Sequence, residues 1–295
     1  MMNAARQRFA CTQCGKCCNR PPEVELSEAA ALSDVFVFSL MFRLYCLPSA
    51  LRDSPGQDIS RQKASEVYYQ SKRLLTAFAV SKYPTKIERG GKAVEYTQYL
   101  TISALTLDTR PGACNALHAK RCSIYDRRPF ACRSVPLHYS RVEALAESDL
   151  RAFVAGSGYD CDTSESAPVL LESGRIVDPE TQQARAKALL LAERDRKWRS
   201  AILRRLKAGA SENALPSLHQ IKTNAPFGAT TTSMRVAWQI AVETGLIDVN
   251  ACTTLIATQL AVIDRELAEA KCTQDTRETL AEMRAEYMNH SRSAD

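Results

Sequence analysis

Four cysteines near the start of the chain have the spacing of metal ligands. They form the run Cys11-x2-Cys14-x2-Cys17-Cys18, which contains Gly15. A C-x2-C turn directs two sulfurs at one ion, and glycine supplies the positive φ that lets backbone N–H groups approach sulfur. Adjacent side chains project in different directions, so either Cys17 or Cys18 must serve a second metal, a second ligand position or packing. The run therefore predicts a thiolate metal centre.

A second set of cysteines lies about a hundred residues further along the chain. It consists of Cys114, Cys122 and Cys132, and Cys161 follows alone. Pro129 suits the first turn of a short helix, which would place Cys132 one turn inside that helix. The eight thiols are enough for two four-thiolate sites, or for one iron–sulfur cluster with structural thiols left over. The spacing alone does not choose between zinc and an iron–sulfur cluster.

The two motifs together resemble those of a known family. A C-x2-C-x2-C-C run followed by the block CSIYDRRPFACR at residues 122–133 is similar to the YkgJ family of cysteine-cluster proteins, described as zinc- or iron-chelating. The resemblance covers about residues 9–177. It implies a shared metal-binding core with the ligands Cys11, Cys14, Cys17, Cys18, Cys114, Cys122, Cys132 and, with a weaker match, Cys161. Flagellin lysine methylase has a similar cysteine-cluster region, which implies a possible enzymatic role.

The other cysteines and two histidines have simpler interpretations. Cys46, Cys252 and Cys272 lie singly in predicted helical stretches, where cysteine usually acts as a small core residue. His118 and His138 flank the second motif and could replace a cysteine as ligand. A surface or hydrogen-bonded histidine is the commoner role, so neither is included among the predicted ligands.

Much of the formal net charge of +6 lies beside the second cysteine motif. The basic residues there are Arg110, Lys120, Arg121, Arg127, Arg128 and Arg133. Four thiolates around Zn²⁺ leave a formal charge of about −2, which nearby arginines offset while they keep thiolate pKa values low. The basic excess therefore fits a metal site and argues against nucleic acid as a partner.

The N-terminal residues and the cysteine content predict a cytoplasmic protein. The first residues lack the apolar segment of a secretory signal. The most apolar stretch, residues 35–42, is far shorter than the roughly 20 residues that span a bilayer, and we interpret it as a buried helix. In a reducing compartment, cysteines serve metal or redox chemistry more often than disulfides. We therefore expect no membrane contact.

The elements that must position the cysteines predict a mostly helical α+β protein. Helical patterns cover residues 27–46, 59–80, 141–155, 179–208, 230–245, 247–271 and 275–290, with a linker at 213–228. Alternating residues predict hairpins of 83–87 with 96–107, across Gly90-Gly91, and of 169–171 with 175–177. We expect a cysteine-cluster metal-binding domain at 1–177, small and irregular with a helical insertion at about 27–80, and a C-terminal helical bundle at 178–295.

Three functions fit this pattern. The first is a metal-binding protein with a structural or electron-transfer role, in which the helical regions serve as scaffold or dock a protein partner. The second is a metal-cluster enzyme acting on a protein substrate, similar to flagellin lysine methylase. The third is a zinc-ribbon-like nucleic-acid binder that uses the basic segment 110–133. Nucleotide-binding and hydrolase motifs are absent, and the sequence leaves open whether the protein is an enzyme.

Overall fold

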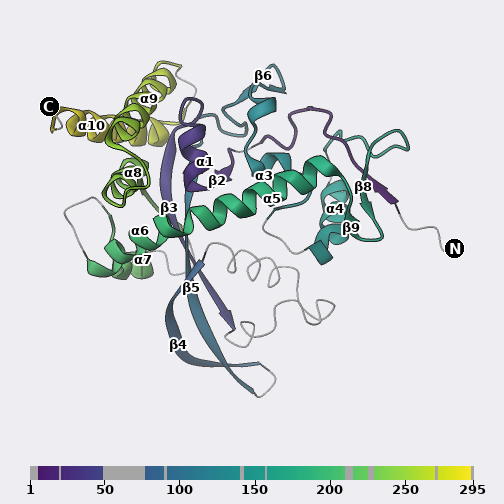
Figure 1. Cartoon of the computed structure of the whole chain (residues 1–295), viewed down its shortest axis with the longest axis horizontal. Coiled ribbons are helices and arrows are strands. Elements are labelled where there is room, and N and C mark those ends of the chain that lie inside the picture. The colour runs from purple at the N-terminus through teal and green to yellow at the C-terminus, as the bar shows by residue number, and fades with distance from the viewer. Residues whose placement is uncertain are drawn as a thin grey trace.

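A five-stranded antiparallel sheet organises most of the chain. The computed structural model describes residues 6–19, 21–48, 77–89, 92–139, 143–156, 158–209, 215–224, 229–269 and 272–293. Helices and small sheets alternate along these residues, so the chain is an α+β protein, as predicted (Figure 1). None of the helices in the described ranges is both long and apolar enough to cross a membrane.

The large sheet has the strand order β10-β3-β5-β2, and β4 also pairs with β5. Its strands are β2 (Glu23–Val24), β3 (Phe38–Pro48), β4 (Ala77–Arg89), β5 (Lys92–Thr106) and β10 (Ala229–Ser233). All of its pairings are antiparallel, and β3 pairs with β5 along its whole length. The β4–β5 hairpin extends away from the rest of the chain (Figure 1). Because β10 comes from the C-terminal part, the sheet joins both parts of the sequence.

Two smaller sheets lie on the cysteine side of the molecule. One has the order β1-β8-β9, formed by β1 (Arg6–Arg8), β8 (Val169–Glu172) and β9 (Arg175–Ile176). The other is the hairpin of β6 (Leu117–His118) and β7 (Arg121–Cys122).

The helices are α1 (Leu26–Ala31), α3 (Phe130–Arg133), α4 (Ala146–Ala155), α5 (Pro179–Arg194), α6 (Arg196–Ala208), α7 (Leu218–Asn224), α8 (Met234–Glu243), α9 (Val249–Ala268) and α10 (Gln274–Ser293). Short 3₁₀ turns occupy Tyr125–Arg127 and Glu143–Leu145. Asp178 caps α5, with Pro179 in its first turn, and Asp248 caps α9. These are the residue types that accept hydrogen bonds from the free N–H groups of a helix start.

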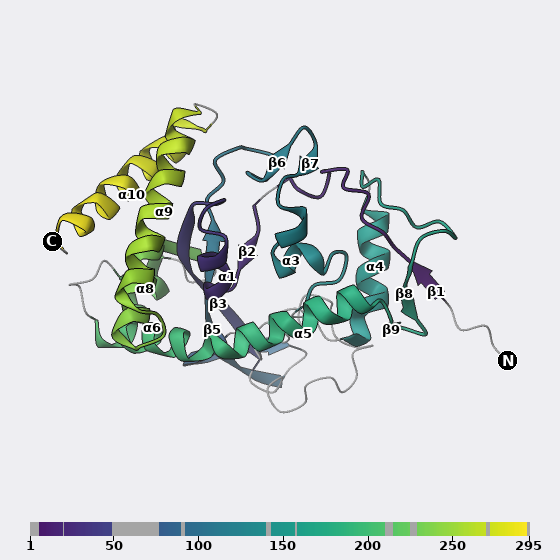
Figure 2. The ribbon, with the colours of Figure 1, turned by 45° about the horizontal axis from the view of Figure 1, so that its top comes forward.

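The buried apolar residues form two separate hydrophobic cores. The larger core packs the sheet against α1, α6, α8, α9 and α10. The smaller core lies under β8, β9 and α4, and consists of Phe9, Leu137, Ala146, Leu150, Leu170, Leu171 and Ile176. Helix α5 runs from α6, beside the larger core, to α4 and β9 at the smaller one, as both views show (Figures 1 and 2). The cysteine segments lie between these two cores.

A buried ion pair joins helix α6 to the sheet. The guanidinium of Arg199 pairs with the carboxylate of Glu25, which directly follows β2. Arg199 also donates to the carbonyl of Ile102 in β5 at 3.0 Å and to that of Ala192 at the end of α5 at 2.9 Å. The Tyr139 hydroxyl donates to Glu25 at 2.8 Å. Four separate segments therefore meet at one buried guanidinium, which is 1% exposed.

The predicted helix over residues 27–46 is wrong. Only Leu26–Ala31 is helical, whereas Phe38–Pro48 is strand β3. Residues 35–42, expected in a buried helix, are buried or nearly so, but as the end of a loop and the start of this strand. β3 has a partner strand on each side and lies in the larger core. Aromatic and β-branched residues favour such a strand, and burial of both faces removes the polar alternation that identifies a strand in sequence.

Both predicted hairpins are present in the structure. The hairpin of β4 with β5 is confirmed and is longer than expected, while its Gly90-Gly91 turn lies outside the described residues. The hairpin of β8 with β9 is also confirmed. The predicted helix over 59–80 lies outside the described residues as far as 76, and 77–80 belong to β4. Of the predicted helix over 141–155, residues 143–145 form a 3₁₀ turn and 146–155 form α4.

In the C-terminal part, the predicted helix over 179–208 is two helices that meet at Asp195. Helices over 230–245, 247–271 and 275–290 correspond to α8, α9 and α10, although 230–233 belong to strand β10. The predicted linker at 213–228 contains α7. The division into domains at 177 and 178 stays a prediction.

We expect Arg199→Met to lower the free energy of unfolding by about 3–5 kcal/mol, because it leaves the Glu25 carboxylate buried without its cation. Arg205→Met is the matched control, since Arg205 lies on the same helix in a half-exposed pair with Glu243 and should lose less than about 1 kcal/mol. The double variant Glu25→Gln with Arg199→Met should recover part of the loss. Urea unfolding measures all three, and equal losses for Arg199→Met and Arg205→Met would contradict the assignment.

Candidate metal centre

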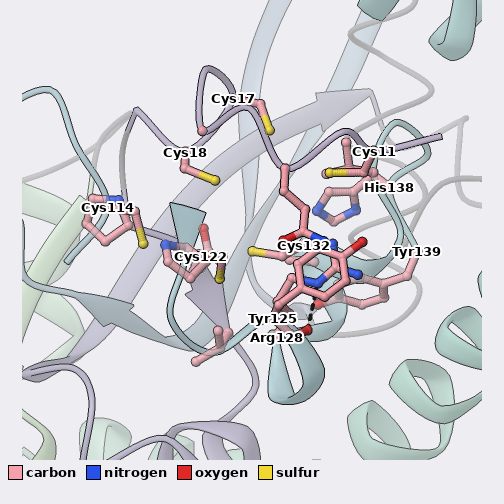
Figure 3. A pocket seen from close by; sticks show the side chains of 18 of the residues that line it. Cys11, Cys17, Cys18, Cys114, Cys122, Tyr125, Arg128, Cys132, His138 and Tyr139 are labelled. Atoms are coloured by element: carbon pink, nitrogen blue, oxygen red, sulfur yellow. Dashed lines mark hydrogen bonds between the residues drawn. The ribbon is translucent and has the colours of Figure 1, made fainter. Parts of the chain in front are cut away.

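The eight predicted cysteine ligands all line one cavity of about 540 Å³ between the two cores. They come from segments that are far apart in the sequence: residues 11–18, residues 114–132, and Cys161. Figure 3 shows Cys18, Cys114 and Cys122 toward one side of the cavity, and Cys11 toward the other beside His138. The structure therefore brings both sequence motifs together, which their spacing alone could not establish.

The start of the first motif is held as an extended strand against residues after α4. Phe9 N–H donates to the carbonyl of Pro168 at 3.1 Å. Ala10 and Asp162 form an antiparallel bridge, with backbone hydrogen bonds of 2.8 and 3.0 Å in the two directions. In an antiparallel pair the neighbouring residues also face each other, so Cys11 lies opposite Cys161. This pairing is what brings the isolated eighth cysteine to the cavity.

The loop of the first motif packs closely on the β6–β7 hairpin. Gly15 has φ +74°, which confirms the predicted glycine conformation, and a Cβ there would lie 2.8 Å from the backbone oxygen of Lys120. At the hairpin turn, Ala119 and Lys120 have φ of 47° and 65°. Two successive positive φ values characterise the tight turns that match the twist of a two-stranded ribbon. Glycine at position 15 is therefore required by the contact as well as by the backbone.

Backbone hydrogen bonds also fix the second motif beside the first. Cys114 N–H donates to the carbonyl of Cys18 at 2.7 Å, and Leu117 N–H donates to the carbonyl of Cys114 at 2.9 Å. Leu117 is then the cross-strand partner of Cys122. Cys132 lies in α3, the short helix that Pro129 predicted. The turns and the hairpin thus bring Cys114 and Cys122 near Cys18.

A buried carboxylate holds the start of α3. Glu28, in α1, accepts a hydrogen bond from the Phe130 N–H at 2.6 Å. Burial raises the pKa of Glu28 to about 7, against a weaker opposing effect of this hydrogen bond. The charged form of a buried carboxyl is costly, so the fold favours the protonated acid.

Arg128 supplies positive charge inside the cavity. Its guanidinium lies 3.7 Å from the centre of the Tyr125 ring, and its Nε donates to the Tyr125 carbonyl at 2.9 Å. Among weaker effects, its charge lowers the pKa of Cys17 and that of Cys132. Other arginines of the basic segment face carboxylates: Arg110 pairs with Glu269 and Arg127 pairs with Asp34.

Burial and neighbouring groups shift the pKa values of several cavity thiols. Burial, followed by the negative charges of Cys114, Glu28 and Cys122, raises the pKa of Cys132 to about 12. A hydrogen bond from the Cys18 thiol lowers the pKa of Cys17 and, reciprocally, raises that of Cys18. Several thiolates in one partly buried space repel one another and lose hydration. A bound cation would relieve both penalties.

The donor set fits a metal that prefers sulfur. Eight thiols and two guanidiniums line the cavity, and thiolates are ligands for zinc and for iron–sulfur clusters. Within the described ranges, no three His, Cys, Asp or Glu side chains already stand in a closed ligand arrangement. Rotation about the Cα–Cβ bonds moves each sulfur within the cavity. The residues that would hold a metal are therefore the cysteines.

The remaining wall of the cavity contains several polar groups beside apolar ones, and sequence reasoning missed most of these polar groups. Glu23 forms an ion pair with Arg43 at 3.3 Å and accepts a hydrogen bond from the Ser103 hydroxyl at 2.8 Å. The rings of His138 and Tyr139 stack with their centres 4.8 Å apart. His138, considered as a ligand from sequence, lines the cavity, whereas His118 lies on β6 and is not among the lining residues. Pairing between distant strands brings Glu23, Arg43 and Ser103 to the cavity wall. No local sequence motif therefore identifies them.

We expect Glu28→Gln to reduce the fall in stability as pH rises from about 5 to about 7. The folded chain keeps a proton on Glu28 that the unfolded chain has already released, so the unfolded state binds fewer protons and stability falls with pH. Relative to the parent, the variant should gain on the order of 1–3 kcal/mol across this window. Urea unfolding at matched metal content measures it. Glu193→Gln, at a carboxylate 71% exposed, should follow the parent curve, and the same curve for Glu28→Gln would exclude the effect.

Gly15→Ala should loosen the contact between the two cysteine motifs. The new methyl group would meet the Lys120 carbonyl, and the positive φ adds about 1–2 kcal/mol of backbone strain. Gly112→Ala is the matched control, because its φ is +80° and a Cβ there would have no heavy atom of the described chain within 4 Å. We expect Gly15→Ala to lower both the unfolding free energy and the metal content more than Gly112→Ala does. Equal effects would mean that the close approach is unimportant.

Comparison with known proteins identifies the segment that carries most of these cysteines. Residues 10–152 match a family model, CxxCxxCC, whose description is "Putative zinc- or iron-chelating domain". The matched segment contains seven of the eight cavity cysteines and ends before Cys161. No curated protein and no solved structure shows a significant match to the chain. Residues 10–152 of this chain are therefore similar to the zinc- or iron-chelating domain that this model describes.

Proposed function

We propose that the protein binds a metal centre through its cavity cysteines, and that the centre has a structural or electron-transfer role. The observation that carries this proposal is the gathering of all eight cysteines from three distant segments around one cavity. The raised thiol pKa values support it, because a bound cation would stabilise the thiolate forms of these sulfurs. The chelating description of the family supports metal binding in general terms.

The structural role follows from where the cysteines lie. Metal held by these sulfurs would tie together residues 11–18, 114–132 and 161, which pack against the larger and the smaller core. Because the ligands converge only in the folded chain, the free energy of metal binding would also stabilise the fold. With zinc the site would be structural, whereas an iron–sulfur cluster in the same thiolates would allow electron transfer.

A second candidate function is a metal-cluster enzyme, and the polar groups in the cavity wall favour it. A zinc ion with sulfurs about 2.3 Å away would fill little of the cavity. A purely structural site has no need of the Glu23–Arg43 pair, Ser103 and His138 beside the thiols. These groups could orient a polar substrate. Binding of S-adenosylmethionine to the metal-loaded protein, abolished by Arg43→Gln, would favour an enzyme similar to flagellin lysine methylase.

The nucleic-acid alternative has less support. Arg110 and Arg127 face carboxylates, and Arg128 stacks on Tyr125 within the cavity wall. Side chains engaged in this way are less available to phosphate groups. Absence of a steep salt dependence in DNA or RNA binding would agree with this argument.

We expect protein purified without oxygen to contain metal, and Cys132→Ser to contain substantially less. Cys132 lines the cavity, whereas Cys252 is buried in the larger core on α9, so Cys252→Ser should keep the parent metal content. Elemental analysis, acid-labile sulfide and a visible spectrum measure the content and distinguish zinc from an iron–sulfur cluster. Parent protein without metal would overturn the proposal, and unchanged content in Cys132→Ser would remove that residue from the ligands.

A further inference from the structure

We propose that the eight cysteines form two separate ligand sets, each holding its own metal centre. The first set is Cys18, Cys114, Cys122 and Cys132, here called the inner set. The second set is Cys11, Cys14, Cys17 and Cys161, here called the outer set. This inference rests on the proposed metal binding and adds the number of centres and the ligands of each. It assigns Cys17 and Cys18, which are adjacent in sequence, to different centres.

Backbone contacts assemble the outer set. The bridge between Ala10 and Asp162 places Cys11 opposite Cys161. The Thr12 hydroxyl donates to the carbonyl of Asp160 at 2.7 Å, and Lys16 Nζ pairs with the Asp160 carboxylate at 2.6 Å. These contacts flank Cys14 on both sides and tie its loop to the residue that precedes Cys161. Contacts between residues 10–16 and 160–162 therefore bring Cys11, Cys14 and Cys161 together. Cys17 completes this set because its neighbour Cys18 is held beside Cys114, and adjacent side chains project in different directions.

A different group of contacts assembles the inner set. The Cys114 N–H donates to the Cys18 carbonyl, a turn leads from Cys114 to Leu117, and Leu117 pairs with Cys122. Helix α3 then brings Cys132 to the same side, where Figure 3 shows it facing Cys122 and Cys18. None of these contacts involves residues 160–162.

Hydrophobic packing gives the same division independently. Cys114 and Cys122 pack against the larger core, whereas Cys11 and Cys161 pack against the smaller one. A single centre that combined ligands of both pairs would need sulfurs anchored in two different cores to meet at one point. Two centres let each core hold its own sulfurs.

Each set contains four thiols, which is the complete ligand shell of a Cys₄ zinc site or of a four-iron cluster. Arg128 lines the same cavity as both sets, with its guanidinium on the Tyr125 ring. One guanidinium placed there offsets part of the negative charge of two neighbouring thiolate centres.

The test compares metal content in single and double cysteine variants of the full chain, purified without oxygen. The parent should contain two centres, and Cys161→Ser and Cys132→Ser should each lose about half of the metal. Cys17→Ser with Cys161→Ser removes two ligands of the outer set, so it should lose no more than Cys161→Ser alone. Cys18→Ser with Cys161→Ser affects both sets and should lose nearly all. Cys252→Ser is the control and should keep both centres.

Far-ultraviolet circular dichroism of each variant shows whether the helices distant from the cavity remain folded. If Cys161→Ser or Cys132→Ser removes all metal while these helices persist, or if the parent holds one centre, the division into two sets is wrong. Equal losses from the within-set and cross-set double variants would also overturn it. A parent without any metal would instead overturn the proposed function itself, so the two failures are distinguishable.

Discussion

The buried ion pair of Arg199 with Glu25 is the constraint on which the arrangement of the cavity depends. Arg199 joins α6 to β5 and α5, while Glu25 borders the cavity and accepts a hydrogen bond from Tyr139, which also lines it. Burial lowers the pKa of Arg199 to about 10, which still leaves the guanidinium charged at neutral pH. A buried pair adds little net stability but is costly to separate. It therefore fixes the position of α6 against the sheet, and with it the position of the residues around the cysteines.

In the Arg199–Glu25 pair opposite charges attract, whereas the cavity gathers thiols whose ionised forms carry the same charge and repel one another. The Cys132 and Cys114 thiols are partly buried and lie near other sulfurs, which raises their pKa values and favours the protonated form. Metal binding would release these protons and replace repulsion between sulfurs by shared coordination. Arg128 offsets part of the charge and, through Tyr125, is itself held in place. Backbone contacts thus position the thiols, whereas a bound metal would supply the positive charge that balances the thiolates.

Local signals predicted the elements that depend on local interactions. The positive φ of Gly15, the helix after Pro129 and the two hairpins followed from turn chemistry and alternation. The strand β3 did not, because both of its edges are paired and its conformation is fixed by distant groups. The Gln259 side chain on α9 donates to the carbonyls of Ser33 and Phe36 and accepts from the Phe38 N–H, which turns the chain from α1 into β3. The eight cysteines were identifiable by type and spacing, whereas their grouping depends on the Ala10–Asp162 bridge.

Because Cys17 and Cys18 are adjacent, one peptide unit would link the two proposed centres. Consecutive Cα atoms are about 3.8 Å apart, so a sulfur of the outer set and one of the inner set belong to neighbouring residues of one rigid peptide unit. Under a structural role, this peptide would join the smaller core to the larger one at the point where helix α5 spans them from the other side. Under an electron-transfer role, the same peptide would keep the two centres at a fixed short separation. Either role explains why the run ends in two adjacent cysteines, since one residue cannot present a sulfur to both cores.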